Sequence, residues 1–95
     1  MIMHTDILRQ RVERWAVTLK VKPVQIRVQS MTRKWASCSS AGRVSFSREL
    51  CEKPADFQDC VIVHELLHLR IRNHGKLFAA TLRSHLPGNP WLDQI

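Results

Sequence analysis

The sequence predicts an α+β fold with an N-terminal helix, a small and mainly antiparallel three-stranded sheet, a helix that bears two histidines, and a C-terminal helix. Three observations support this order. Apolar residues recur at helical spacing near the N-terminus, they alternate with polar residues over positions 24–29, and a mostly apolar run covers positions 60–69. A chain of 95 residues has room for one modest core, so we expect residues 1–95 to form a single domain.

The first predicted element is a helix over approximately residues 6–20. Either Thr5 or Asp6 can cap its N-terminus, because both side chains accept hydrogen bonds from the free N–H groups of a first helical turn. The inward face of this helix consists of four residues at helical spacing, namely Leu8, Val12, Trp15 and Leu19. The helix should therefore cover one side of the core.

Three short strands are predicted to follow. Over residues 24–29, Val24, Ile26 and Val28 alternate with polar residues, which is the period-two pattern of a half-buried strand. Residues 34–38 and 43–47 form two further strands, and the segment Ser39-Ser40-Ala41-Gly42 between them favours a tight turn. Together the three segments suggest a small, mainly antiparallel sheet.

The next predicted helix covers approximately residues 54–72 and carries the most informative motif of the chain. Pro54 suits a first helical turn, and Asp56 complements the positive end of the helix dipole. Within this helix lies the run His64-Glu65-Leu66-Leu67-His68, a His-Glu-x-x-His pattern surrounded by apolar residues. Such surroundings are typical of a buried helix rather than of a solvated one.

The spacing of the two histidines predicts a metal site. Positions i and i+4 of a helix lie on one face, so His64 and His68 can reach one cation while Glu65 lies beside a remaining coordination position. A charged Glu65 in an apolar helix also needs a partner, which a cation supplies. The alternative interpretation is that both histidines are ordinary, partly buried helix residues.

A third ligand is needed for a catalytic zinc site, which usually takes three protein ligands and leaves a fourth position for water. His74 is the best candidate, although a continuous helix would rotate it by about 240° from His68. The helix must therefore end first, and Asn73 and Gly75 are residues that commonly terminate helices. Alternatively, His74 is a polar residue in a turn between two helices. We expect Zn²⁺ as the cofactor.

A last helix is predicted between Gly75 and approximately residue 85. Phe78 and Leu82 should point inward, because they are four positions apart on one helical face. Pro87 follows as the stop signal, since proline cannot continue a helix without losing a backbone hydrogen bond.

The net charge of +7 is concentrated in the N-terminal half. Residues 1–48 contain ten Lys or Arg against two acidic residues, whereas the remaining residues contain five against six. This basic half could bind a nucleic-acid backbone or an acidic protein segment, or it could be a solvated surface with no partner. No recognisable nucleic-acid motif accompanies the charge.

Cysteine usage and hydropathy predict where the protein works. Cys38, Cys51 and Cys60 are odd in number and lack Cys-x-x-Cys spacing, so we expect reduced thiols that pack in the fold. Cys38 could alternatively approach the metal as a thiolate. The sequence has neither a membrane-length apolar run nor the apolar stretch of a signal peptide. We therefore expect a monomeric cytoplasmic protein that does not bind membranes.

Several segments resemble the YgjP-like metallopeptidase domain over roughly two thirds of the chain. The resemblance is carried by Arg33-Lys34-Trp35-Ala36-Ser37-Cys38-Ser39, Phe46-Ser47-Arg48-Glu49-Leu50, the His-Glu-x-x-His run, and Asn73-His74 with Phe78. The chain departs from the family pattern at Ala36, where Gly is usual, at Ser47, where Asn is usual, and at Ala79, where Trp is common. None of these departures removes a candidate ligand.

The resemblance implies a minimal zincin-like fold, similar in layout to SprT-like proteases, with His64, His68 and His74 as ligands and Glu65 as general base. The predicted function is a zinc-dependent metallohydrolase acting on a peptide or protein substrate. A second electrophile for the substrate carbonyl cannot be a tyrosine, because the chain has none, and the candidates are Arg33, Arg48 and His85.

Two other functions are kept open. One is a metal-dependent ribonuclease resembling the YbeY family, which has three histidines at this spacing and would use the basic half to bind RNA. Glu65 argues against this function, because that family resembles His-Gly-x-x-His. The other is a non-catalytic module for binding nucleic acid or protein that retains zinc for stability.

Overall fold

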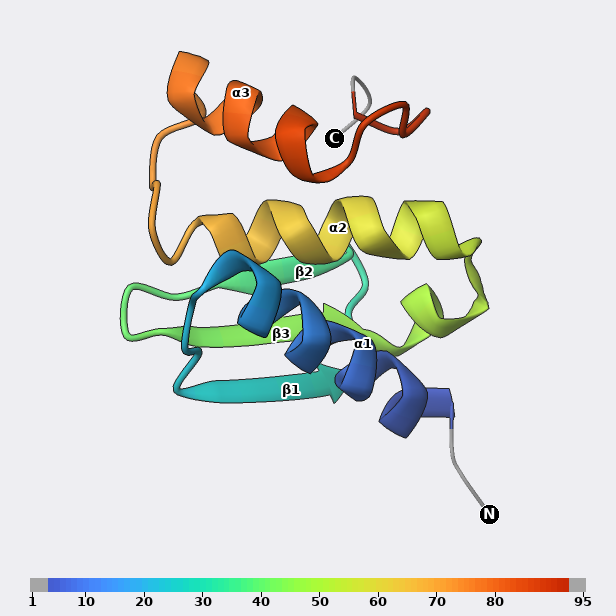
Figure 1. Ribbon diagram of the computed structural model, residues 1–95. Helices are drawn as coiled ribbons and strands as arrows, with labels where there is room; N and C mark the ends of the chain where they lie inside the picture. Colours follow the sequence, from blue (N-terminus) through green and yellow to red (C-terminus); the bar gives the residue numbers. More distant parts are fainter. Residues whose placement is uncertain (1–3, 93–95) are drawn as a thin grey trace.

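The computed structural model describes residues 4–92 and shows two helices packed against a small sheet, with a third helix lying on the outer side of the second (Figure 1). Helix α1 spans His4–Leu19, α2 spans Ala55–Leu67 and α3 spans Lys76–His85. The strands are β1 (Gln25–Gln29), β2 (Ala36–Cys38) and β3 (Arg43–Ser47). A short 3₁₀ helix, η1 (Arg48–Glu52), links β3 to α2 and was not predicted.

The α+β class and the predicted order of the main elements are confirmed, but the sheet is mixed. Its strand order is β1-β3-β2, with β1 parallel to β3 and β2 antiparallel to β3. The physical reason is burial. Val44 and Phe46 of β3 are fully buried, so this strand takes the centre of the sheet, whereas β2 offers only Ala36, Ser37 and Cys38 and lies at the edge. The parallel pair is possible because the chain returns to β3 through the β2 hairpin.

The hydrophobic core lies between the sheet and the helices α1 and α2. Helix α1 contacts β1 and α2, while α2 contacts β2 and α3. Helix α1 buries one stripe of residues at helical spacing, namely Leu8, Val12, Ala16 and Leu19. Trp15 is only partly buried, and Val24, predicted as an inward strand residue, is 72% exposed because it precedes β1.

A hydrogen-bonded carboxylate connects the N-terminal helix to α2. Asp59 Oδ1 accepts hydrogen bonds from Arg11 Nη1 and Trp15 Nε1, both at 2.9 Å. Both donors lie on α1, so this single oxygen fixes the relative position of the two helices that cover the sheet. The contact is partly buried, which strengthens it relative to an exposed ion pair.

Helix α2 ends earlier than predicted. The helical assignment stops at Leu67, with His68 as the C-terminal cap, and not near residue 72. The final turn is tightened by i→i+3 hydrogen bonds, in which the N–H groups of Leu69 and Arg70 donate to the carbonyls of Leu66 and Leu67. The tight turn redirects the chain before Asn73, which leaves residues 70–75 free to fold back.

We expect Asp59→Ala to lower the free energy of unfolding by about 1–2 kcal/mol, because it leaves the Trp15 N–H and the Arg11 guanidinium without their acceptor. Chemical denaturation of the purified protein measures this loss. Glu13→Ala, which removes an exposed carboxylate on α1, serves as the matched control. Equal stabilities of the two variants would contradict the role assigned to Asp59.

Candidate metal centre

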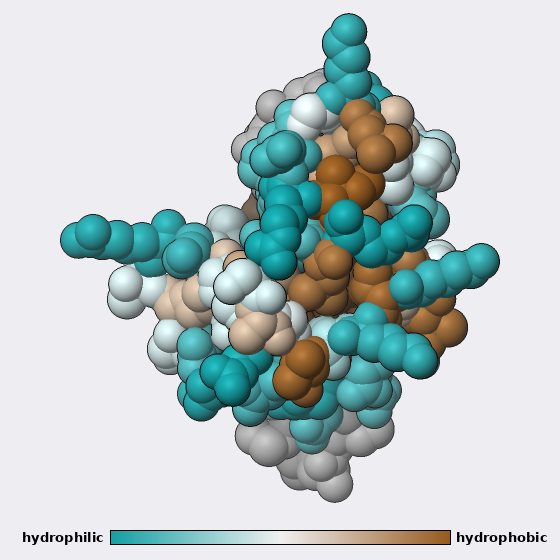
Figure 2. All heavy atoms as spheres, turned by 90° about the vertical axis from the view of Figure 1, so that its left-hand side faces the viewer, coloured by the Kyte–Doolittle hydropathy of each residue, from teal (hydrophilic) through white to brown (hydrophobic). Residues whose placement is uncertain are grey.

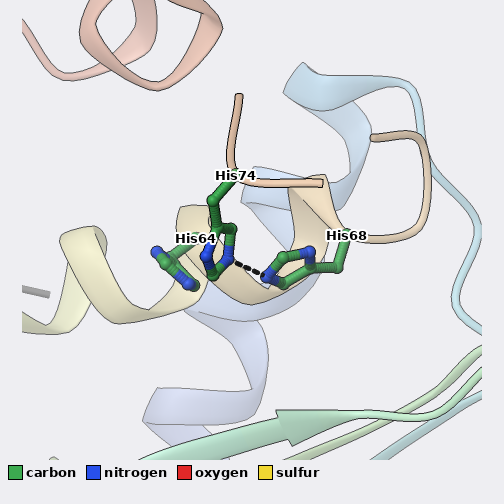
Figure 3. A group of neighbouring side chains, drawn as sticks. All are labelled: His64, His68 and His74. Atoms are coloured by element: carbon green, nitrogen blue, oxygen red, sulfur yellow. Dashed lines mark hydrogen bonds between the residues drawn. The ribbon is translucent and has the colours of Figure 1, made fainter. Parts of the chain in front are cut away.

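Three imidazole rings meet at the C-terminal end of α2 (Figure 3). His64 lies on α2, His68 is the C-terminal cap of that helix, and His74 comes from the loop that precedes α3. The ring centroids of His64 and His68 are 5.1 Å apart, and that of His74 lies 4.9 Å from the first and 4.6 Å from the second. One nitrogen from each ring can be chosen so that all lie within 4.8 Å of one another. The fold thus gathers the histidines that the spacing singled out.

Phe78 of α3 supports all three rings from one side. Its ring centroid lies 5.2 Å from that of His64 and 4.9 Å from those of His68 and His74, and its side chain is buried. The sequence predicted Phe78 as an inward residue but did not connect it with the histidines. The available signal was the four-residue spacing from His74 to Phe78, which allows a loop residue to lie in contact with a residue of the following helix.

The environment of His64 keeps its ring neutral. Burial, together with the positive charges that His68 and His74 can carry, lowers the pKa of His64 from 6.5 to about 4. Its Nδ1 atom is buried and has no hydrogen-bond partner among the described residues. A neutral imidazole with a free nitrogen is the form that binds a metal ion.

A hydrogen bond between His68 and His74 shows what a metal would replace. Their Nε2 atoms lie 2.8 Å apart, so one of the two rings must hold a proton between them (Figure 3). A divalent cation bound to both nitrogens would displace that proton. Three imidazole donors fit zinc, and they also suit other late first-row metals, so the chemistry of the donors alone does not select the ion.

Glu65 lies next to the histidines in a groove along the edge of the sheet. Burial raises the pKa of its carboxyl group, while the positive charges of Lys34 and His74 oppose the rise. The groove has a volume of about 400 Å³, and we call it the β2 groove. Its walls include Lys34, Ala36, Cys38, Glu65, His68 and Arg72. A carboxylate made more basic by burial, beside a metal centre, suits proton transfer.

The surroundings of Cys38 and Trp35 indicate packing roles for both residues. Burial and the nearby charge of Glu65 raise the pKa of the Cys38 thiol, which keeps it protonated at neutral pH, and Cys38 is outside the histidine cluster. The three cysteines are free thiols. Trp35 makes an edge-to-face contact with Phe57 of α2, with ring centroids 5.4 Å apart, so it anchors the hairpin to the helix.

The cations nearest to Glu65 are not those that the sequence suggested. Arg33, Arg48 and His85 do not line the β2 groove, whereas Lys34 and Arg72 do. Lys34 lies two residues before the edge strand, and Arg72 lies in the loop after α2. The sequence prediction used Arg72 only as the end of a helix, although its four-residue spacing from His68 was an available signal.

The comparisons with known proteins identify first the class of protein. One similar structure is the crystal structure of the metallopeptidase zymogen jannalysin of Methanocaldococcus jannaschii, which is 25% identical to this chain with a TM-score of 0.76. The similarity covers 86% of this chain and 84% of that one. The fold is therefore that of a metallopeptidase, a hydrolase.

The sequence then identifies the family. The family model described as the YgjP-like metallopeptidase domain matches residues 3–94, and the chain belongs to this family. The resemblance noted from the sequence motifs is thereby confirmed. No curated protein matches the chain. Over the described residues, every helix is too short or too polar to cross a membrane.

The lowered pKa of His64 predicts how the stability of the metal-free protein depends on pH. Between pH 6.5 and about 4 the unfolded chain gains a proton at His64 that the folded chain does not, so stability falls as the pH falls through this range. We expect this pH-dependent loss of unfolding free energy to be about 1–2 kcal/mol smaller in His64→Asn than in the wild type. Denaturation with a chelator present measures both proteins, and identical pH profiles would contradict the assignment.

Proposed function

We propose that this metallopeptidase domain is a zinc-dependent peptidase in which His64, His68 and His74 hold the ion and Glu65 is the general base. The observation that carries the proposal is the convergence of three imidazoles, one of which lines the β2 groove together with the half-buried carboxylate of Glu65. When bound, zinc supplies a Lewis acid that makes a water molecule acidic near neutral pH and polarises a carbonyl group.

The protein residues supply binding and proton transfer in this proposal. Glu65 accepts a proton from the attacking water and returns it to the leaving amine, a role for which its raised pKa is suitable. Lys34 and Arg72 place positive charge in the same groove, where negative charge develops on the substrate carbonyl oxygen. These two side chains take the place of a tyrosine as candidate electrophiles.

The position of β2 suggests how a substrate binds. Because β2 is an outer strand of the sheet, its free edge carries backbone groups that can pair with an extended peptide. The same edge forms one wall of the β2 groove, opposite Glu65 and His68. A peptide aligned on β2 would therefore run past the proposed metal centre. The ribonuclease alternative, which the sequence left open, gives the free edge of β2 no comparable role in binding the substrate.

The size of the chain and its free thiols support the further proposal of a monomer that works in the cytoplasm. A nucleic acid remains a proposed partner of the basic N-terminal half, supported by the excess of Lys and Arg in residues 1–48.

We expect zinc-loaded wild-type protein to hydrolyse casein or a peptide mixture, and Glu65→Gln to reduce the rate by about 10²–10⁴-fold, because the amide cannot accept the proton. Fluorescence release from labelled casein measures the rate. Glu52→Gln, an exposed glutamate on η1, is the matched control and should retain wild-type activity.

The same preparations are incubated with single-stranded RNA. Cleavage of RNA but not of casein by the wild type would favour the ribonuclease alternative. If neither polymer is cleaved while zinc raises the melting temperature, the non-catalytic module would be the better description.

A further inference from the structure

A second groove adjoins the proposed active site at the end of the molecule that faces the viewer in Figure 2. It lies where the turn after α1, the β2–β3 turn and the loop after α2 meet, and it has a volume of about 450 Å³. We call it the cationic groove. Its lining includes Lys20, Lys22, Ser40, His68, Arg70 and Arg72. Long hydrophilic side chains project from this face (Figure 2).

The charge of this groove is uncompensated. Its lining contains no Asp or Glu, and no carboxylate of the described residues lies within ion-pair distance of Lys20, Lys22 or Arg72. Arg70 is used structurally, since its Nη1 donates to the carbonyl of Leu19 at 3.1 Å and holds the loop against α1. The remaining cations repel one another in a concave site, where their field is concentrated, and an anionic ligand would relieve that repulsion.

The backbone around Lys20 fixes this arrangement. Lys20 adopts a left-handed conformation with φ of 58°, and the N–H of Val21 donates to the carbonyl of Ala16 at 3.0 Å. This geometry ends α1 sharply and directs the chain toward β1. Lys20 and Lys22 therefore lie on a short, ordered link at one wall of the groove and not on a long loop.

The two grooves form one continuous path. Ser39, His68 and Arg72 line both of them, so the cationic groove begins where the β2 groove ends. Cys38, the last residue of β2, lines the β2 groove together with Glu65. At about 3.3 Å per residue, a peptide extended along β2 passes from Glu65 into the cationic groove within about one to three residues.

We propose that the cationic groove is a specificity subsite for acidic side chains, so that the peptide substrate carries Asp or Glu one to three residues to one side of the bond that is cleaved. This inference rests on the proposed peptidase function. A peptide fits better than a nucleic acid because the groove continues a strand edge that pairs with peptide backbone. Apart from His68, its lining has no aromatic ring on which a base could stack.

Cleavage of a proteome-derived peptide library by the zinc-loaded protein, read by mass spectrometry, tests the proposal. We expect Asp and Glu to be enriched within three positions on one side of the cleaved bonds. A matched pair of peptides, with Glu or Gln at those positions, should differ in kcat/KM by on the order of tenfold, and added salt should reduce the difference.

The variant Lys20→Gln/Lys22→Gln removes two charges from the cationic groove without changing a residue of the β2 groove. We expect it to reduce the Glu-over-Gln preference to about twofold or less. The control Arg14→Gln/Arg27→Gln removes two exposed charges outside both grooves and should keep the preference. A preference that is absent in the wild type, or that is unchanged in the lysine variant, would overturn the proposal.

A binding measurement separates this inference from the proposed catalysis. Fluorescence anisotropy of the same Glu and Gln peptides, carrying a neutral dye, is recorded with zinc-loaded Glu65→Gln protein. The measurement reports binding alone and does not depend on hydrolysis. Tighter binding of the Glu peptide that is lost in the lysine double variant would support the subsite even if the wild type hydrolysed nothing. Equal binding of both peptides, with single-stranded RNA bound through the same lysines, would overturn it in favour of a nucleic-acid surface.

Discussion

The early end of α2 is the constraint on which the proposed site depends. If the helix continued beyond His68, His74 would be rotated by about 240° from His68. Instead the last turn tightens at residues 68–71, and the chain folds back so that the His74 and His68 nitrogens lie 2.8 Å apart. Arg70 fixes this turn by donating to α1, which makes the N-terminal helix a structural part of the site.

The sequence predicted those parts of the fold and site that depend on local spacing. The i and i+4 histidines and the alternation in β1 are each properties of a few neighbouring residues. The strand order β1-β3-β2 depends instead on which strand has the most apolar surface to bury, a comparison between distant segments. The cations of the β2 groove were missed for a related reason, because their position beside Glu65 depends on how the β2 segment and the loop after α2 pack against that helix.

The arrangement of layers explains how a chain of this size can present both the proposed metal centre and the proposed substrate path. Helix α2 contacts the edge strand β2 on one side and α3 on the other. Its polar residues therefore lie between the edge of the sheet and the loop that carries His74. Phe78 of α3 then supports the histidine rings through direct contact. Membership of the YgjP-like metallopeptidase family and the similarity to jannalysin agree with this layout.

The most direct test of the account is the metal content of natively purified protein, measured by elemental analysis. The account predicts about one zinc per wild-type chain, much reduced in His64→Ala and in His74→Ala but retained in His85→Ala, whose ring lies near Trp15 and outside the cluster. A wild-type protein that stays free of metal after zinc is supplied would contradict the three-histidine site. So would zinc retained in full by His74→Ala, because the returning loop would then have no role in binding the ion.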